Sequence, residues 1–283
     1  MFKVAALMTC FNRVKVTLAC LEHLFAVKLP SHWQLDVWLV DDASPDKTGP
    51  LVKARYPHVH VIESEGNLYW SKGMRLAWDS ATQVYDYDAY LWLNDDVMVF
   101  ADAFETLQHD RDLVDNSSEC VFLGACQAGK EDTTISHSGS FYDGRKAIPN
   151  GKSPLLINPV MSGNFVFVPQ IVFQKIGPIY DGFMHGHGDL DYGLRTEKAG
   201  IKRYLCSKPV GICPHQPERY LHLKGRPLAG RLKLLFEPKG YPIHDTILLR
   251  YRNQGVLRML VSIFHILAIV IFAIEPKANK AKG

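Results

Sequence analysis

The sequence has few cysteines, and none of them forms a recognisable pair. Its six cysteines are spread over 283 residues, and no two have the two-residue gap of a redox or zinc motif. This excludes a disulfide scaffold and indicates reduced, mostly buried thiols in a cytosolic protein. We also expect no signal peptide, because the apolar run Val4–Cys10 ends at Asn12 and Arg13 without a small-residue cleavage site. A first buried strand fits that run better.

The sequence also lacks internal repeats, low-complexity segments and nucleic-acid-binding motifs. Its 47% hydrophobic and 22% charged residues exclude a disordered or collagen-like chain. The net charge of +3 averages two unlike parts. Residues 1–215 hold 20 basic and 25 acidic side chains, a net −5, whereas residues 216–283 hold 12 and 4, a net +8. The pattern predicts an acidic catalytic or binding body and a basic tail that meets something anionic.

The C-terminal segment Met259–Ile274 lacks Asp, Glu, Lys and Arg, and His265 is its only titratable side chain. As a helix its 16 residues would span about 24 Å, less than the ~30 Å hydrocarbon core of a bilayer. Arg258 precedes it, and three lysines follow between 277 and 282. We therefore predict a helix that lies on or in an anionic membrane face. The alternative is a buried hairpin or an oligomer helix.

Apolar runs alternate with stretches of helical periodicity along most of the chain. The predicted strands are 3–10, 37–40, 59–62, 90–93 and 165–169, and the predicted helices are 14–27, 73–82 and 189–200. We expect residues 117–170 to be rich in β-structure but irregular, and 209–217 to form a loop. The alternation predicts βαβ units in a mostly parallel sheet, which binds ligands at the carboxyl ends of its strands.

Two predicted strands end in acidic clusters. Val40-Asp41-Asp42-Ala43-Ser44-Pro45-Asp46 follows one, and Asn94-Asp95-Asp96 follows another. Crowded carboxylates favour a cation, and Mg²⁺ or Mn²⁺ often bridges them to a diphosphate. The first cluster could instead accept hydrogen bonds from a base or a ribose. The alternatives are a solvated turn at Asp95-Asp96 and a helix N-cap formed by Ser44 or Asp46.

A third motif is Met184-His185-Gly186-His187-Gly188-Asp189-Leu190-Asp191. At the start of a helix and beside glycines, Asp189 could act as a general base, which contributes about 10²–10⁴-fold to a rate. Asp191 and Arg195 are four residues apart and could pair along the helix. A zinc site of the H-x-H-x-D-H kind is the alternative, but Leu190 stands where the last His is needed. His215 gains interest only if the chain folds back to the acidic cluster.

In this order the motifs resemble family 2 glycosyltransferases, which are inverting enzymes with a GT-A fold. The resemblance covers roughly residues 3–217. It rests on Met8-Thr9-Cys10-Phe11-Asn12-Arg13, on the turn at 40–46, on Glu65-Gly66-Asn67-Leu68-Tyr69-Trp70-Ser71-Lys72-Gly73-Met74, on Leu93-Asn94-Asp95-Asp96, on the helix from Asp189 to Arg195, and on His215. The sequence departs from the family pattern at Asn94, which replaces the first Asp of D-x-D. It departs again at Gly188, which replaces the Glu before the base, a role that His185 or His187 could supply.

The resemblance implies a GT-A domain at 1–217, with a Rossmann-like mixed but mostly parallel sheet flanked by helices. The charge and the apolar run of the tail predict a basic, apolar helical extension at 218–283 that associates with a membrane. The resemblance also implies a metal-dependent inverting hexosyl- or deoxyhexosyltransferase that uses Mg²⁺ or Mn²⁺. The expected donor is a nucleotide-diphosphate sugar, with UDP or dTDP favoured. The expected acceptor is a hydroxyl of a lipid-linked glycan in bacterial surface polysaccharide synthesis, on the inner face of the cell membrane.

The same resemblance assigns roles to residues. Asp189 is the catalytic base, Asp96 and His215 are metal ligands, and His185, His187 and Asp191 lie near the acceptor. The residues assigned to nucleotide and donor binding are Thr9, Phe11, Asn12, Arg13, Asp41, Asp42, Asn67, Trp70, Lys72, Gly73, Asn94 and Asp95.

Two other functions remain open. A sugar-phosphate nucleotidyltransferase also uses a parallel sheet and Mg²⁺, but it carries a glycine-rich loop after the first strand, and Cys10–Lys15 has no glycine. A non-catalytic GT-A scaffold or assembly subunit would explain Asn94 and Gly188.

Overall fold

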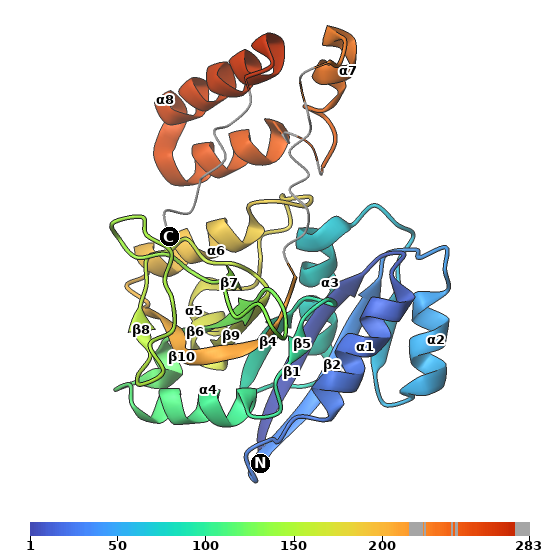
Figure 1. Ribbon diagram of the computed structural model, residues 1–283, viewed down its shortest axis with the longest axis vertical. Coiled ribbons are helices and arrows are strands. Elements are labelled where there is room, and N and C mark those ends of the chain that lie inside the picture. Colours follow the sequence, from blue (N-terminus) through green and yellow to red (C-terminus); the bar gives the residue numbers. More distant parts are fainter. Residues whose placement is uncertain (215–222, 224, 239, 241–242, 275–283) are drawn as a thin grey trace.

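The computed structural model describes residues 1–214, 223, 225–238, 240 and 243–274. Its body is a ten-stranded sheet in the order β3-β2-β1-β4-β9-β6-β10-β5, with β7 beside β6 and β8 beside β10 (Figure 1). The strands are β1 (Phe2–Cys10), β2 (Trp33–Asp41), β3 (His60–Glu63), β4 (Ala89–Leu93), β5 (Met98–Val99), β6 (Val121–Gln127), β7 (Ile135–His137), β8 (Leu155–Leu156), β9 (Phe165–Pro169) and β10 (Arg203–Ile212).

The sheet has a parallel half and a mixed half. Strands β3, β2, β1 and β4 are parallel. β9 is antiparallel to both β4 and β6, and β10 is parallel to β6 but antiparallel to β5 and β8. The parallel half therefore ends in loops at one edge, and β9 begins at that same edge because it runs the opposite way. This brings loops from distant parts of the sequence together.

Both faces of the sheet are covered by helices. Within β1, Val4, Ala6 and Met8 join one core cluster, and Ala5 and Leu7 join the other. A central parallel strand must be apolar on both faces, which explains the unbroken run in the sequence. The helices that contribute to the first cluster are α1 (Val14–Phe25), α2 (Thr48–Arg55) and α4 (Ala103–Asp112), and those of the second are α3 (Tyr69–Val84), α5 (Gln170–Ile176) and α6 (Gly188–Lys198).

The predicted strands and helices of the body are confirmed. The predicted loop at 209–217 is wrong at residues 209–212 but agrees with the structure at 213–214, which have no regular secondary structure. Residues 209–212 complete β10, while 215–217 lie outside the described residues. Pro209 lies at a shift of register between β10 and β6, where the missing N–H disturbs no regular ladder. Proline and glycine in this run are typical of a loop. The register shift that accommodates them in a strand can be recognised only from the pairing of β10 with β6.

Two further helices, α7 (Leu228–Lys233) and α8 (Ile243–Phe272), lie together at one end of the molecule (Figure 1). Gly255 has a φ of 82° and divides α8 into two arms. The first arm borders α6, and the second is apolar and exposed. Of its most apolar 18-residue stretch only 6% is buried, so the described structure does not support a buried hairpin. By length and composition alone α8 could cross a membrane.

Candidate active site

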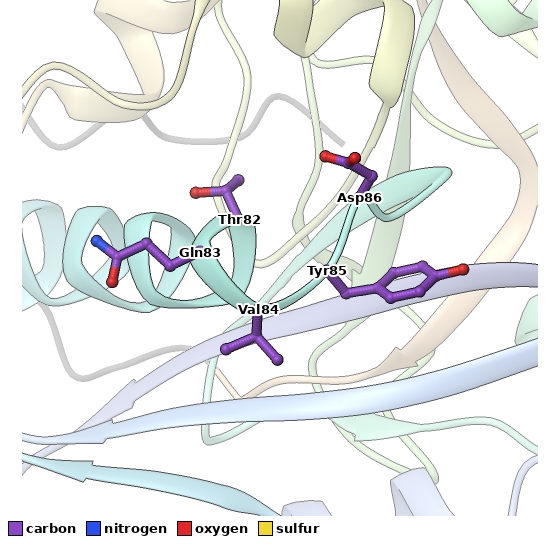
Figure 2. A pocket seen from close by; sticks show the side chains of 5 residues that line it. All are labelled: Thr82, Gln83, Val84, Tyr85 and Asp86. Carbon is purple, nitrogen blue, oxygen red and sulfur yellow. The ribbon is translucent and has the colours of Figure 1, made fainter.

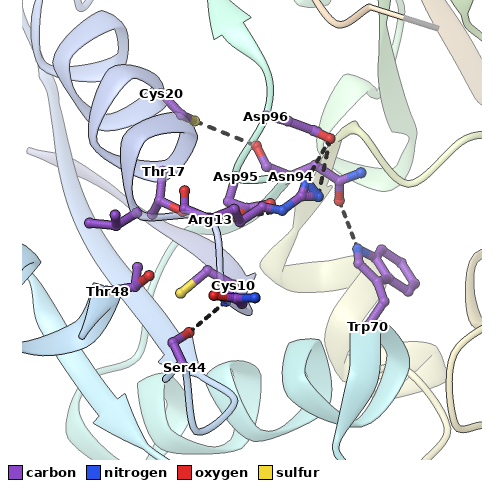
Figure 3. Close-up of polar contacts among 12 residues, drawn as sticks. Cys10, Arg13, Thr17, Cys20, Ser44, Thr48, Trp70, Asn94, Asp95 and Asp96 are labelled. Carbon is purple, nitrogen blue, oxygen red and sulfur yellow. Dashed lines mark hydrogen bonds and ion pairs between the residues drawn. The ribbon is translucent and has the colours of Figure 1, made fainter. Parts of the chain in front are cut away.

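The loop after β4 places two carboxylates around one guanidinium (Figure 3). Asp96 Oδ2 accepts hydrogen bonds from Arg13 Nη1 at 2.9 Å and Nη2 at 3.3 Å. Asp95 Oδ2 lies 3.3 Å from Arg13 Nε and accepts a bond from Thr17 Oγ1 at 3.0 Å. Burial raises the pKa of Asp95 to about 7, although Arg13 opposes that shift. Arg13 and Thr17 are present because α1 starts directly after β1.

A chain of contacts leads from this cluster to Asp189. Trp70 Nε1 donates to Asn94 Oδ1 at 2.7 Å, and the indole lies against Gly163, where a Cβ would strike the ring. Gly163 N donates in turn to Asp189 Oδ2 at 3.3 Å. The sheet register explains this proximity, since β9 is paired with β4 so that Phe165 lies opposite Leu93. Two acidic motifs that are almost 100 residues apart therefore share one site.

Asp189 lies half-buried in the first turn of α6. Burial raises the pKa of its carboxyl group, and hydrogen bonds from Leu190 N at 2.8 Å and from Gly163 N oppose the shift. A carboxyl group with a raised pKa is a better proton acceptor when it is ionised. The helix N-terminus also favours its charged form.

Gly188 has a steric reason for lacking a side chain. A Cβ there would lie 2.6 Å from Ser71 Oγ and 3.2 Å from Ser71 Cβ. Ser71 in turn holds the segment before α6, because its N–H donates to Met184 O and its hydroxyl to His185 O, both at 3.2 Å. The absence of the expected Glu therefore reflects a close contact between α3 and the start of α6.

Asp41, the last residue of β2, and Asp42, which follows it, are turned inward. They are only 3% and 5% exposed. Asp41 accepts from Ser44 N at 3.1 Å and from Gly49 N at 2.7 Å. Asp42 accepts from Leu68 N, Tyr69 N and Ser64 Oγ, each at 2.9 Å. These two carboxylates shape the loops after β2 and β3 and satisfy the first N–H groups of α3.

Residues with positive φ gather in these loops. Asn12, Ala43, Asn67, Tyr69 and His187 all have φ between 53° and 67°. They follow β1, β2 and β3 or precede α6, so all of them lie around the same edge of the sheet. Backbone strain of this kind is concentrated at functional sites, which supports a binding role for this edge.

The remaining residues assigned to the donor lie on these loops, at the end of β1 and in the first turns of α3. Phe11 is 49% exposed at the end of β1, and Asn12 and Asn67 are also exposed. Thr9 and Lys72 are half-buried. Gly73 allows α3 to approach β1, because a Cβ there would overlap the Thr9 side chain. These residues form a rim around the carboxylates.

The three residues assigned to the acceptor differ in their surroundings. His185 packs edge-on against Tyr69, with ring centroids 6.0 Å apart. His187 Nε2 lies 3.3 Å from Thr246 Oγ1, and burial lowers its pKa. Asp191 is fully buried and pairs with Arg195 at 2.9 Å, as the spacing predicts. Its other oxygen contacts Asn253 and Arg252 on α8.

A divalent metal requires several ligand atoms that converge on one point. Among the described residues, no group of three or more His, Cys, Asp or Glu side chains could hold a metal ion, which leaves the zinc alternative at 185–189 without support. Asp96 nevertheless faces a cationic guanidinium, so its carboxylate is oriented to stabilise positive charge. Cys213 Sγ lies 3.6 Å from Asp96 Oδ1, so the chain that leads to His215 does return to the cluster. His215 itself lies outside the described residues.

Several residues of this site were not predicted from the sequence. No role is predicted for Thr17 or Gly163, and Cys213 is of interest only because it stands two residues before His215. Each contacts a motif residue only through the folded chain. The one signal in the sequence for Gly163 is its place just before an apolar strand.

All six cysteines are buried, and none forms a disulfide.

One pocket lies away from this site. It has a volume of about 390 Å³ and is lined by Thr82, Gln83, Val84, Tyr85 and Asp86. Figure 2 shows these five side chains at the end of α3 and in the loop that follows it. This loop leads into β4, at the opposite end of that strand from the acidic cluster. The strained loops and paired carboxylates, not this pocket, mark the candidate active site.

Comparisons with solved structures agree with this fold. The S. aureus TarS fragment 1–349 in complex with UDP-GlcNAc is 12% identical, with a TM-score of 0.59 over 98% of this chain and 82% of that one. The mannosyltransferase PcManGT from Pyrobaculum calidifontis, in complex with GDP-Man and Mn²⁺, is 15% identical, with a TM-score of 0.56 over 94% and 69%. GalNAc-T7 with UDP, GalNAc and Mn²⁺ is 14% identical, with a TM-score of 0.57 over 80% and 45%.

No curated protein matches the sequence. The pattern of glycosyl transferase family 2 matches residues 5–159, more than half of the chain, and this range contains the strand-end loops after β1, β2, β3 and β4. The mixed sheet and its flanking helices have the GT-A arrangement. This chain belongs to glycosyl transferase family 2.

Proposed function

We propose that this protein is an inverting glycosyltransferase that moves a hexosyl or deoxyhexosyl group from a nucleotide-diphosphate sugar to a hydroxyl of a lipid-linked glycan. The observation that carries the proposal is the contact chain from Asp96 and Asn94 through Trp70 and Gly163 to Asp189. It supports a single site in which a cation would be held at Asp96 and the carboxylate of Asp189 would act as the base.

In this mechanism Asp189 accepts the proton of the acceptor hydroxyl, and the resulting oxygen attacks the anomeric carbon from the side opposite the leaving group. The configuration is therefore inverted. Its raised pKa makes Asp189 a stronger base than an exposed aspartate. Gly163 N–H and the helix N-terminus orient the carboxylate before the acceptor arrives.

A divalent cation, Mg²⁺ or Mn²⁺, would be held by Asp96, with Asn94 or Asp95 and His215 as further ligands. When bound, it would neutralise charge on the diphosphate leaving group. PcManGT in complex with GDP-Man and GalNAc-T7 with UDP and GalNAc both contain Mn²⁺, which supports this assignment. Arg13 supplies positive charge at the same position from the chain itself.

The donor nucleotide would lie on the rim of the carboxylate cluster, with UDP or dTDP favoured. The exposed ring of Phe11 offers a face for a base, and Asn12, Asn67 and Lys72 offer polar and charged contacts. Asp41 and Asp42 support this site through the loops that they hold. The neighbours bound to UDP-GlcNAc, UDP and GDP-Man support a nucleotide sugar without selecting the base.

The acceptor would approach from the end of the molecule that carries α7 and α8. In Figure 1 the carboxyl end of β1 points toward those helices, and α6, which carries Asp189, borders α8. Leu257, Phe264 and Phe272 on the second arm are each more than 70% exposed. A membrane contact there, with the protein on the inner face of the cell membrane, would bring a lipid-linked acceptor to Asp189.

The main experiment pairs transfer and binding measurements. The full chain is incubated with UDP-, dTDP- and GDP-sugars, Mn²⁺ and a lipid-linked glycan acceptor, and nucleotide affinity is measured by calorimetry. We expect Asp189→Asn to lose at least about 10²-fold of transfer while donor affinity stays within about twofold. Donor affinity that collapses with activity would contradict the base assignment. No turnover and no nucleotide binding in the wild type would favour the non-catalytic scaffold.

The membrane contact has its own test. Phe264→Glu should reduce binding to vesicles that contain anionic lipid, and deletion of Arg258–Gly283 should abolish it. Val84→Glu is the matched control, because Val84 is 65% exposed but lies at the end of α3, near the far edge of the body. Equal vesicle binding by the wild type and the deletion would leave this segment with a structural role only.

A further inference from the structure

The first arm of α8 reaches into the segment that precedes Asp189. Asp245, in the first turn of α8, is only 1% exposed. Its carboxylate accepts backbone hydrogen bonds from Met184 N at 3.2 Å, His185 N at 3.2 Å and Gly186 N at 3.3 Å. Three consecutive N–H groups thus converge on one buried anion from a helix about 60 residues away in the sequence.

These three N–H groups belong to a segment without regular secondary structure, since α6 starts only at Gly188. Backbone donors in such a segment need an external acceptor, and a charged one gives the stronger hydrogen bonds. Ser71 holds the carbonyl groups of Met184 and His185 from the opposite side. The segment is therefore fixed between α3 and α8.

Residues that precede and follow Asp189 in the sequence both contact the first arm of α8. Before Asp189, His187 Nε2 lies 3.3 Å from Thr246 Oγ1. After it, Asp191 Oδ1 accepts from Asn253 Nδ2 at 2.9 Å and lies 3.3 Å from Arg252 Nε. Since Asp189 lies between these anchored points, its position depends on where the first arm of α8 is seated.

We propose that Asp245 is a positioning residue for transfer: its carboxylate orders the backbone of Met184–Gly186 and thereby sets the place of Asp189 at the acceptor. The inference rests on the proposed function, in which Asp189 is the general base. Misplacement of a catalytic group by about 1 Å costs roughly 10²-fold in rate. Donor binding should be spared, because the residues assigned to the donor lie at the ends of β1 and β2, on the loops after the parallel strands and in the first turns of α3.

The test uses the full chain and two substitutions. Asp245→Ala removes all the acceptors, whereas Asp245→Asn keeps one carbonyl oxygen in a side chain of the same shape. Hydrogen exchange followed by mass spectrometry reports the amides of 184–186, and steady-state kinetics report kcat and the KM for the donor. Glu237→Gln is the matched control, because it removes one negative charge from the same extension, in the turn that follows α7.

We expect Asp245→Ala to speed exchange at 184–186 at least tenfold and to lower kcat about 10²-fold, with the donor KM within about threefold of the wild type. The exchange rates at 184–186 and the kcat of Asp245→Asn should lie between those of the wild type and Asp245→Ala. Glu237→Gln should match the wild type in both. Unchanged exchange at 184–186, or a loss confined to donor KM, would overturn the proposal. So would faster exchange of the whole body in both Asp245 variants.

The two proposals fail differently. If the wild type transfers no sugar from any donor, the proposed function fails. The exchange measurement still decides whether Asp245 orders Met184–Gly186. If the wild type transfers sugar and Asp245→Ala does so equally well, only the positioning role fails.

Discussion

Asp41-Asp42 and Asp95-Asp96 look alike in the sequence, since each pair follows an apolar strand of the parallel half of the sheet. Their partners differ. The first pair accepts hydrogen bonds from backbone N–H groups and from a serine, and both of its carboxylates are turned inward. The second pair shares the guanidinium of Arg13, and Asp96 has 14% of its side chain exposed.

The difference shows that one motif can serve two purposes. Carboxylates that satisfy backbone N–H groups fix the course of a loop, so their loss should mainly reduce stability. A carboxylate that faces a cation and is partly exposed, as Asp96 is, can contact a ligand, so its loss should mainly reduce function. Substitutions in the two pairs should therefore have opposite signatures.

The largest effect is expected for Asp96→Ala. It removes the carboxylate that would hold the cation beside the diphosphate leaving group. Transfer should therefore fall by about 10²–10³-fold, and the dependence of donor binding on Mn²⁺ should disappear. Calorimetric titration of a nucleoside diphosphate with and without Mn²⁺ checks this. An unchanged Mn²⁺ dependence would show that Asp96 does not hold the cation, and the two aspartate pairs would then not differ in function.

Asp42→Ala is the counterpart within the first pair. It leaves Leu68 N, Tyr69 N and Ser64 Oγ without their acceptor, and we expect the free energy of unfolding to fall by about 3 kcal/mol. Urea unfolding of the wild type, Asp42→Ala and Asp96→Ala measures the contrast. Equal stability losses in the two variants would show that the pairs differ less than their contacts suggest.

Arg13→Gln tests whether the guanidinium competes with a metal ion for Asp95 and Asp96. Without the guanidinium, Asp95 and Asp96 keep their mutual repulsion, and the affinity for Mn²⁺ should rise about tenfold. Electron paramagnetic resonance of free Mn²⁺ measures this without a turnover assay. Arg55→Gln, which removes a guanidinium paired with Glu22 at the surface, should leave Mn²⁺ affinity unchanged. Weaker Mn²⁺ binding by Arg13→Gln would show that Arg13 assists the cation.

The smallest effect concerns Asp189, whose pKa is raised by burial, as that of Asp95 is. Because the folded state holds its proton more tightly than the unfolded state, stability falls as pH rises from the unfolded pKa, near 3.9, to the higher folded pKa. Asp189→Asn avoids this loss. It should therefore be slightly more stable than the wild type at pH 7, and the difference should vanish below the unfolded pKa. Thermal unfolding at several pH values measures this, and lower stability of the variant at pH 7 would contradict it.

Much of the body could be predicted from the sequence because its signals are local. The apolar run that forms β1 and the helical spacing of α1 need no distant partner to be recognised. Asp191 and Arg195 pair as predicted because a helix turn fixes their separation. The last part of β10 was missed because its strand pairing comes from β6, more than 80 residues earlier.

The alternation of strands and helices, the acidic ends of the strands and the apolar C-terminal segment can be predicted from the sequence, because each depends on neighbouring residues. Sheet pairing and helix packing are needed to learn which carboxylates face a cation, which ones hold a loop, and that Asp245 contacts Met184–Gly186. Those outcomes depend on sheet order and on helix packing, which bring together residues that are far apart in the chain and that no local pattern connects.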